Sequence, residues 1–162
     1  MTAMESVTLK KLKDRFPDSI IETHSFRGDE TAIVKKEKII EICKFLRDDE
    51  GLLYNFMMDL TAVDYIGREP RFEVVYHLYS LKYNRRVRIK APVSESDCTI
   101  DSIISIWIAA DWFEREAYDL YGIIFRGHPN LKRILLYEGF EGHPLRKDYP
   151  VKGRQPLIGP KD

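Results

Sequence analysis

The side chains of this chain that could do chemistry are concentrated near its C-terminal end, and they are Glu114, Glu116, His128 and His143. Paired carboxylates serve as general acid and base when their surroundings push their pKa values apart. Side chains two positions apart on a helix point about 200° away from each other, so Glu114 and Glu116 cannot face one substrate on an intact helix. The spacing therefore argues against catalysis by this pair.

The two histidines share an unusual local sequence, because each lies between a glycine and a proline, in residues 127–129 and 142–144. Two imidazoles held in turns could bind a metal ion, but no third ligand accompanies them at a suitable spacing. We expect His128 and His143 to be buried hydrogen-bonding rings that fix the chain around them, with a metal site as the alternative.

Other catalytic patterns are missing from the sequence. Cys43 and Cys98, the only two cysteines, lie far apart, so cysteines of this chain alone cannot build an iron–sulfur or zinc site, and we expect both in the core. The chain has no glycine-rich dinucleotide loop, no phosphate loop and no nucleophile elbow. These absences favour binding over chemistry.

Composition narrows the class of protein further. The 162 residues fit one domain, and a hydrophobic fraction of 44% is ordinary for a globular protein. The formal net charge of zero argues against non-specific nucleic-acid binding, which calls for a basic field. The longest apolar run, residues 103–110, is far shorter than the roughly 18 residues of a membrane span. With no signal-peptide pattern at the N-terminus, we expect a cytoplasmic protein with an intact N-terminus.

The first half of the chain shows clear periodic patterns. Apolar spacing predicts helices over residues 6–16 and 36–47, and two extended segments, 19–26 and 30–34, flank a turn at 27–29. Three further extended segments, 53–63, 71–81 and 86–91, predict an antiparallel meander. In the last of these, apolar residues alternate with Arg86, Arg88 and Lys90, which indicates a strand with one basic face. We interpret it as a solvated edge of the sheet, with a partner-facing strand as the alternative.

The second half is less regular. We expect a short helix from Thr99 or Asp101 to Trp107, and another beginning near Asp111, where Asp111 and Glu114 match a capping box. Gly122 would end that helix in the left-handed conformation. Beyond it, one strand is predicted at 133–137. The fold class is therefore α+β, a mixed, mostly antiparallel sheet with helices on one face, with a domain over 1–125 and an extended C-terminal arm over 126–162.

One face of the helix after Asp111 is unusual in its composition. It combines Trp112 with three charged residues, Arg115, Glu116 and Asp119, and this mixture is costly to bury unless a partner supplies matching groups. The simpler alternative is an ordinary i,i+4 ion pair between Arg115 and Asp119. Residues 145–150 of the arm, with two cations and one anion, suit pairing with a neighbouring protein surface.

Several motifs in this region closely resemble a known family. They are ERE at 114–116, DLYGI at 119–123, Phe125, GHP at 127–129, KRIL at 132–135 and GHPLRKDYP at 142–150. A looser likeness includes DLTAVD at 59–64 and FEVVY at 72–76. Together they resemble the 30 kDa (C-type) subunit of NADH–quinone oxidoreductase, respiratory complex I. The combination is specific, because rare residue types recur in a fixed order and spacing.

The resemblance implies a non-catalytic, peripheral-arm subunit at the cytoplasmic face of the inner membrane. Iron–sulfur clusters, flavin and quinone would lie on partner subunits, with none on this chain. The implied partners are the large quinone-site subunit (D type) and the subunit carrying the terminal iron–sulfur cluster (B type). The implied interface and motif residues are Trp112, Glu114, Arg115, Glu116, Asp119, Gly122, His128, Pro129, Arg133, His143, Pro144, Arg146, Lys147, Asp148 and Tyr149.

Two other functions fit parts of the sequence. An equivalent subunit of a membrane-bound nickel–iron hydrogenase or of a deazaflavin-dependent dehydrogenase would share the fold and part of the motif. A free-standing hydrolase using Glu114 and Glu116 is the alternative from a different class, and such a protein would turn over a substrate in isolation.

Overall fold

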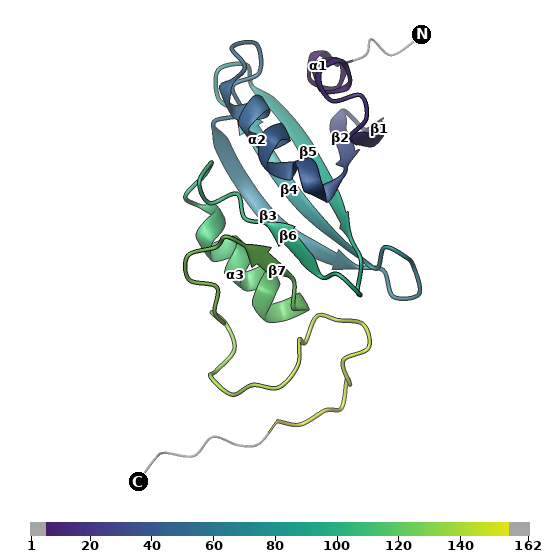
Figure 1. Ribbon diagram of the computed structural model, residues 1–162, viewed down its shortest axis with the longest axis vertical. Coiled ribbons are helices and arrows are strands. Elements are labelled where there is room, and N and C mark those ends of the chain that lie inside the picture. Colours follow the sequence, from purple (N-terminus) through teal and green to yellow (C-terminus); the bar gives the residue numbers. More distant parts are fainter. Residues whose placement is uncertain (1–5, 156–162) are drawn as a thin grey trace.

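The computed structural model describes residues 6–155 as a sheet covered by helices and followed by a long arm (Figure 1). The elements are α1 (Val7–Arg15), β1 (Ile20–Phe26), β2 (Asp29–Val34), the 3-10 helix η1 (Lys36–Lys38), α2 (Ile39–Asp48), β3 (Phe56–Asp64), β4 (Phe72–Ser80), β5 (Arg85–Val93), β6 (Thr99–Asp101), α3 (Ala110–Tyr121) and β7 (Ile124–Arg126). The five-stranded sheet has the order β1-β2-β5-β4-β3, and β6 and β7 form a second, two-stranded sheet. This architecture confirms the predicted α+β fold.

The predicted antiparallel meander β3-β4-β5 is confirmed, but the position of β5 is not. Its other neighbour is β2, which pairs with it in parallel, with Ala32 beside Ile89. Strand β5 is therefore the centre of the sheet, and the expectation of a solvated edge was wrong. The alternation itself is confirmed, since Val87, Ile89 and Ala91 are buried. On the opposite face Lys90 pairs with Glu73 at 2.8 Å.

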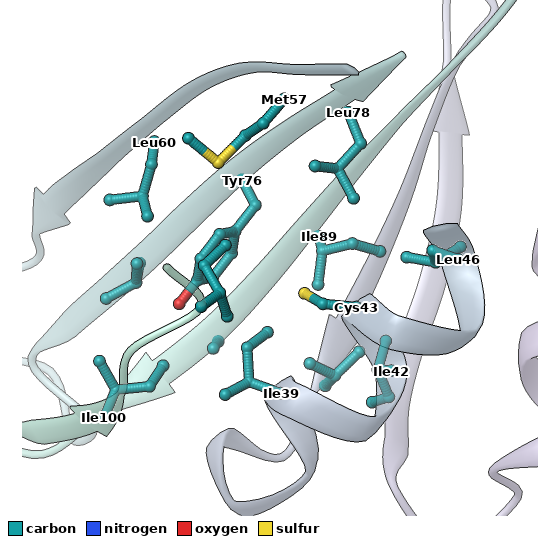
Figure 2. Packing of buried hydrophobic residues seen from close by; sticks show 14 of the residues in the cluster. Ile39, Ile42, Cys43, Leu46, Met57, Leu60, Tyr76, Leu78, Ile89 and Ile100 are labelled. Atoms are coloured by element: carbon teal, nitrogen blue, oxygen red, sulfur yellow. The ribbon is translucent and has the colours of Figure 1, made fainter. Parts of the chain in front are cut away.

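The core lies between one face of this sheet and the helices (Figure 2). Helix α2 contributes the predicted stripe of Ile39, Ile42, Cys43 and Leu46, all fully buried. These side chains belong to one cluster with apolar residues of β3, β4 and β5, and α3 extends the same cluster through Ala110 and Ala117. Burial, followed by the nearby Glu114 carboxyl, raises the pKa of the Cys43 thiol, so this cysteine is an unreactive core residue.

Two local predictions in the second half were wrong. Residues 99–107 do not form a helix, because Ile100 lies in the short strand β6 beside Phe125 of β7, and turns follow. Both side chains are buried in the core, so this pairing outweighs the local apolar spacing. Strand β7 was not predicted. Helix α3 begins at Ala110, close to the predicted start, but its N-cap is Ala109, so the capping box of Asp111 and Glu114 does not form.

The C-terminal arm has neither helix nor strand from residue 127 to residue 155. Its predicted continuation to residue 162 lies outside the described residues, and the division at 125/126 stays a prediction. None of the helices within residues 6–155 has the length and apolarity that crossing a bilayer requires.

The central position of β5 generates a stability prediction. Ile89→Ala should lower the free energy of unfolding by about 2–5 kcal/mol, because it leaves a cavity in a packed core. Ile21→Ala, which shortens an exposed side chain of the edge strand β1, should cost less than about 1 kcal/mol. Urea denaturation followed by circular dichroism measures both changes. Equal losses in the two variants would contradict the placement of β5 at the centre.

Candidate functional site

The C-terminal end of α3 brings together five of the predicted site residues: Asp119, Gly122, Arg133, His143 and Arg146. The last four carbonyl groups of a helix have no partner within the helix. The first of them, on Tyr118, accepts the N–H of Gly122 at 2.8 Å. Gly122 has φ +77°, as predicted for the residue that ends the helix. A Cβ atom here would lie 2.6 Å from His143 Nε2, so glycine also permits the close approach of the arm.

The arm binds the other three carbonyl groups. The Asp119 oxygen accepts from His143 Nδ1 at 2.9 Å and from Arg133 Nη1 at 3.2 Å. The Leu120 oxygen accepts the N–H of Leu145 at 3.1 Å, and the Tyr121 oxygen accepts from Arg146 Nε at 2.6 Å. The arm is thus the C-terminal cap of α3, and its two arginines place positive charge where the helix dipole favours it.

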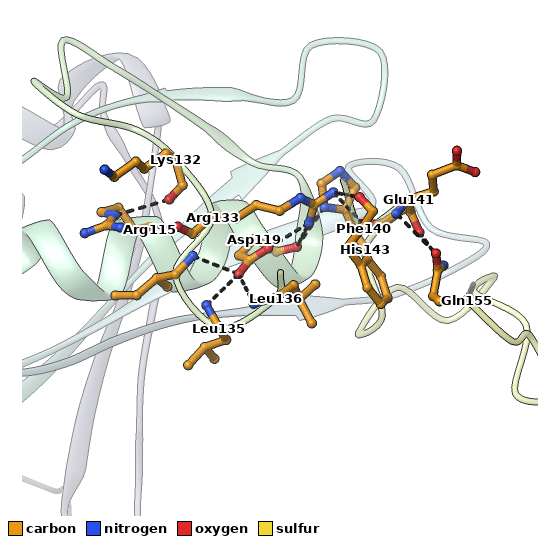
Figure 3. Close-up of polar contacts among 12 residues, drawn as sticks. Arg115, Asp119, Lys132, Arg133, Leu135, Leu136, Phe140, Glu141, His143 and Gln155 are labelled. Atoms are coloured by element: carbon orange, nitrogen blue, oxygen red, sulfur yellow. Dashed lines mark hydrogen bonds and ion pairs between the residues drawn. The ribbon is translucent and has the colours of Figure 1, made fainter. Parts of the chain in front are cut away.

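The Asp119 carboxylate fixes the first part of the arm (Figure 3). It is fully buried and accepts from Arg133 Nη1 at 2.7 Å. Its other oxygen accepts three consecutive backbone N–H groups, from Ile134, Leu135 and Leu136, at 3.0, 2.8 and 2.9 Å. These donors converge on one oxygen, which a strand could not achieve, so the predicted strand at 133–137 is absent.

The electrostatics of Asp119 follow from these contacts. Burial acts to raise the pKa of the carboxyl, but the N–H of Leu136, the Arg133 guanidinium and the N–H groups of Ile134 and Leu135 together outweigh it. The pKa is therefore lowered, and the group stays charged at neutral pH.

Arg115 and Arg133 do not play the parts that helical spacing suggests. Arg115 donates to the carbonyl oxygens of Lys132 and Arg133, both at 3.2 Å, so the i,i+4 pair with Asp119 was the wrong alternative. Arg133 instead pairs with Asp119 and also donates to the carbonyl oxygens of Phe140 and Gly142, at 2.9 and 3.0 Å. Both arginines therefore hold the arm.

Both histidines hydrogen-bond within the chain and fix the arm, as predicted, with the His128 side chain buried and His143 half-buried. His128 Nδ1 accepts the N–H of Asn130 at 3.0 Å, so Nε2 carries the proton and donates to the Asp111 carbonyl oxygen at 3.3 Å. His143 donates from Nδ1 to the Asp119 carbonyl. Burial lowers the pKa of His143, and nearby arginines add to this, so the ring is neutral at pH 7. Among residues 6–155 no group of histidine, cysteine, aspartate and glutamate is placed to hold a metal ion.

A second cluster of charged residues, centred on Arg71, also holds the arm. Arg71 was not among the predicted site residues. Arg71 is buried and forms a two-bond pair with Asp64, at 2.9 and 2.8 Å. It also donates to Asp148 of the arm at 3.1 Å, and to Glu95 at 2.6 Å. Asp64 accepts the N–H of Lys147 at 2.7 Å. Asp64 is the last residue of the DLTAVD motif, and this motif was the sequence signal that could have identified the cluster.

The two glutamates that could have formed a catalytic pair are not brought together. Glu114 is fully buried and accepts from the Ser102 hydroxyl at 2.6 Å and the Ile103 N–H at 2.8 Å, whereas Glu116 is exposed. Burial raises the pKa of Glu114 to about 7, although both hydrogen bonds act to lower it. This carboxyl ties the loop before α3 to the helix.

The remaining motif residues are divided between packing and exposure. Tyr149 stacks on Phe140 at 6.2 Å between ring centres, and Pro144 is half-buried. Pro129 and Lys147 are exposed, and so is Trp112, which is 62% exposed under the Arg115 guanidinium. The charged groups of the motif thus find partners mostly within the chain. Their direct role at a partner interface stays a prediction.

Comparison with known proteins points in one direction. A family described as "Respiratory-chain NADH dehydrogenase, 30 Kd subunit" matches residues 32–155. The C-type subunit of NADH-quinone oxidoreductase from Geotalea uraniireducens (strain Rf4) is 54% identical over 151 residues, which cover 92% of this chain and 91% of that protein. The protein of the same name from Geobacter sulfurreducens is 51% identical over 152 residues, covering 92% and 93%.

Solved structures show the same fold. The trypsin-resistant fragment of Nqo5 superposes with a TM-score of 0.64 at 29% identity, covering 77% of this chain and all (100%) of the fragment. A chain of the membrane-bound sulfane sulfur reductase, an archaeal respiratory membrane complex, has a TM-score of 0.75 at 23% identity and covers 89% of this chain and 84% of its own length. The second likeness shows the fold alone.

Removing the buried charge should release the arm. Asp119→Asn should lower the free energy of unfolding by about 3–5 kcal/mol, because it leaves Arg133 without its anion. It should also speed trypsin cleavage within residues 126–155, read by mass spectrometry. Glu116→Gln, which neutralises an exposed carboxylate on the same helix, is the matched control and should change neither. An arm that stays protected in Asp119→Asn would contradict the assignment of the cap.

Glu114 generates a pH prediction. Its folded-state pKa of about 7 lies above the ordinary value of 4.5, so its contribution to stability is complete below about pH 4.5 and is lost as the pH rises through 7. Glu114→Gln removes this loss. The difference in unfolding free energy between the variant and the wild type should therefore rise in favour of the variant by about 2–3 kcal/mol between pH 5 and pH 8.

Urea titrations across that range measure the difference for Glu114→Gln. The same titrations of Glu116→Gln should show no such trend, because Glu116 is exposed. A flat profile for Glu114→Gln would mean that the buried carboxyl is not destabilised by its surroundings.

Proposed function

This chain belongs to the family of the 30 kDa subunit of respiratory-chain NADH dehydrogenase, and from that premise we propose that it is a non-catalytic subunit needed to assemble the quinone-reducing module. In this role the chain positions other polypeptides and carries out no chemical step. The module would transfer electrons from NADH to quinone, coupled to ion translocation, on other subunits.

One observation carries this proposal. The charged side chains of the motif mostly bind partners within the chain, while apolar side chains around them are exposed to solvent. Ile108, just before α3, is 80% exposed, and Trp112, in the first turn of α3, is 62% exposed. Leu135, whose N–H is bound by Asp119, is 61% exposed. We call these three residues the apolar row.

Two residues of the apolar row, Trp112 and Leu135, are held in place by residues that bind the arm. Arg115 stacks on Trp112 with its guanidinium carbon 5.4 Å from the ring centre, and the same guanidinium binds the carbonyl oxygen of Arg133. Leu135 follows two residues later and is fixed by the Asp119 carboxylate. Large apolar side chains fixed on a rigid surface are typical of protein–protein interfaces. The row is therefore suited to docking onto other subunits.

We assign two neighbours to this surface, a large quinone-site subunit of D type and a subunit of B type that carries the terminal iron–sulfur cluster. The clusters, flavin and quinone are assigned to partner subunits, in keeping with a sequence that has two cysteines. The chain would then lie at the cytoplasmic face of the inner membrane through the complex.

The other functions considered from the sequence have less support. Identities of 51–54% to C-type subunits of NADH-quinone oxidoreductase favour that complex over a hydrogenase or a deazaflavin-dependent dehydrogenase. A hydrolase would need Glu114 and Glu116 at one substrate, and α3 keeps them apart.

The apolar row supplies the test. The double variant Trp112→Ser/Leu135→Ser should fold with near-native stability, because both side chains are exposed, yet it should reduce the amount of assembled complex in membranes at least about tenfold. Native gels of membranes from a strain carrying only the variant measure assembly. Ile66→Ser, at an exposed apolar residue of the β3–β4 turn, is the control and should assemble normally. Normal assembly of the double variant with reduced turnover per complex would overturn the proposal.

A further inference from the structure

One end of the large sheet carries basic side chains that the fold leaves unpaired. They are Arg27 in the β1–β2 turn, Lys82 in the β4–β5 turn, and Arg85 and Arg86 at the start of β5. Within residues 6–155 none of these four forms an ion pair. We call these four residues the basic end. At the other end of β4, by contrast, Arg71 is paired with carboxylates.

The topology brings the two turns together. Strand β2 runs parallel to β5 with Glu30 beside Val87, so the turn before β2 and the turn before β5 lie at the same end of the sheet. An open groove of about 460 Å³ separates them. It is lined by Arg27, Gly28, Asp29, Glu30, Asn84, Arg85 and Arg86. Three of the four unpaired cations therefore face one groove.

Aromatic rings hold the cations in place. The guanidinium carbons of Arg27 and Arg85 lie 5.2 and 5.3 Å from the ring centres of Phe26 and Tyr83. Arg86 lies 5.8 Å from the ring centre of Tyr79. Stacking leaves the N–H groups of a guanidinium free to donate while it limits the side chain's motion, which lowers the entropy lost when an anion binds.

The acidic residues of the groove do not neutralise it. Asp29 lies 3.9 Å from Arg88, so an arginine outside the basic end already accompanies it. Glu30 is half-buried, and one of its carboxylate oxygens has no hydrogen-bond partner, so the lining sets three arginines against two carboxylates. Because the whole chain has a formal net charge of zero, this local excess of positive charge is a real asymmetry of the molecule.

We propose that the basic end binds an acidic polypeptide segment, with carboxylates of that segment paired with Arg85 and Arg86 and bordered by Arg27. Planar guanidiniums match carboxylates with two parallel hydrogen bonds, which favours this partner. A lipid surface fits less well, because the three arginines line a groove, which a segment of chain can enter and a flat layer of headgroups cannot. This site is at the opposite end of β4 from the arm, so it is a second interaction surface, beyond the assembly role proposed above.

The test uses the full chain and fluorescein-labelled hexaglutamate, with binding followed by fluorescence anisotropy. Binding should weaken between about 0.05 and about 0.15 M salt, because exposed charges are screened. The double variant Arg85→Ala/Arg86→Ala should lower the affinity at least about tenfold. The control is Arg68→Ala, which removes another arginine that stacks on a tyrosine, Tyr65, in the β3–β4 turn, and it should leave the affinity unchanged.

Three results would overturn the inference. The first is that the chain does not bind hexaglutamate at the lower salt concentration. The second is that Arg68→Ala loses as much affinity as the double variant. The third is that the chain binds phosphatidylglycerol vesicles, measured by co-sedimentation, more tightly than it binds hexaglutamate. Circular dichroism of each variant shows whether it is folded. Because the assay needs no other subunit, its outcome is independent of whether the apolar row directs assembly.

Discussion

The open carbonyl groups at the end of α3 are the constraint on which the C-terminal third of this molecule depends. A helix that ends at a glycine leaves acceptors that must find donors, and the arm supplies them through His143, Leu145 and Arg146. The buried Asp119 carboxylate adds a second demand for donors, which Arg133 and three backbone N–H groups meet. An arm without helix or strand thereby has a defined path.

This arrangement changes how the motif relates to function. Charged residues that look suited to a partner mostly bind other parts of the same chain. Burying a charged group with its hydrogen-bond partners costs less free energy than burying it without them. What remains outside near α3 is apolar, at Ile108, Trp112 and Leu135. The polar residues therefore act on a partner indirectly, by fixing the surface that the partner would meet.

Sequence reasoning succeeded where structure depends on near neighbours. The stripe of α2 and the alternation of β5 follow local periods, and Gly122 follows from its own conformational freedom. It failed where the local structure depends on a segment distant in sequence. Pairing with β2 places β5 at the centre of the sheet, and pairing with β7 makes residues 99–101 a strand. The N–H groups of residues 134–136 turn toward one oxygen of Asp119. The motif includes the residues that cap α3, yet Arg71 was missed because its partners are spread over three segments of the chain.

The parallel pairing of β2 with β5 also bears on how the chain emerges during translation. Strand β2 ends at Val34, whereas its neighbour begins at Arg85. At roughly 5–20 residues per second, the ribosome completes β5, at Val93, roughly 3–12 s after β2. During that interval the β1–β2 hairpin has an open edge and no central strand to join. Until β5 is made, this edge is open to pairing with the edge of another newly made chain.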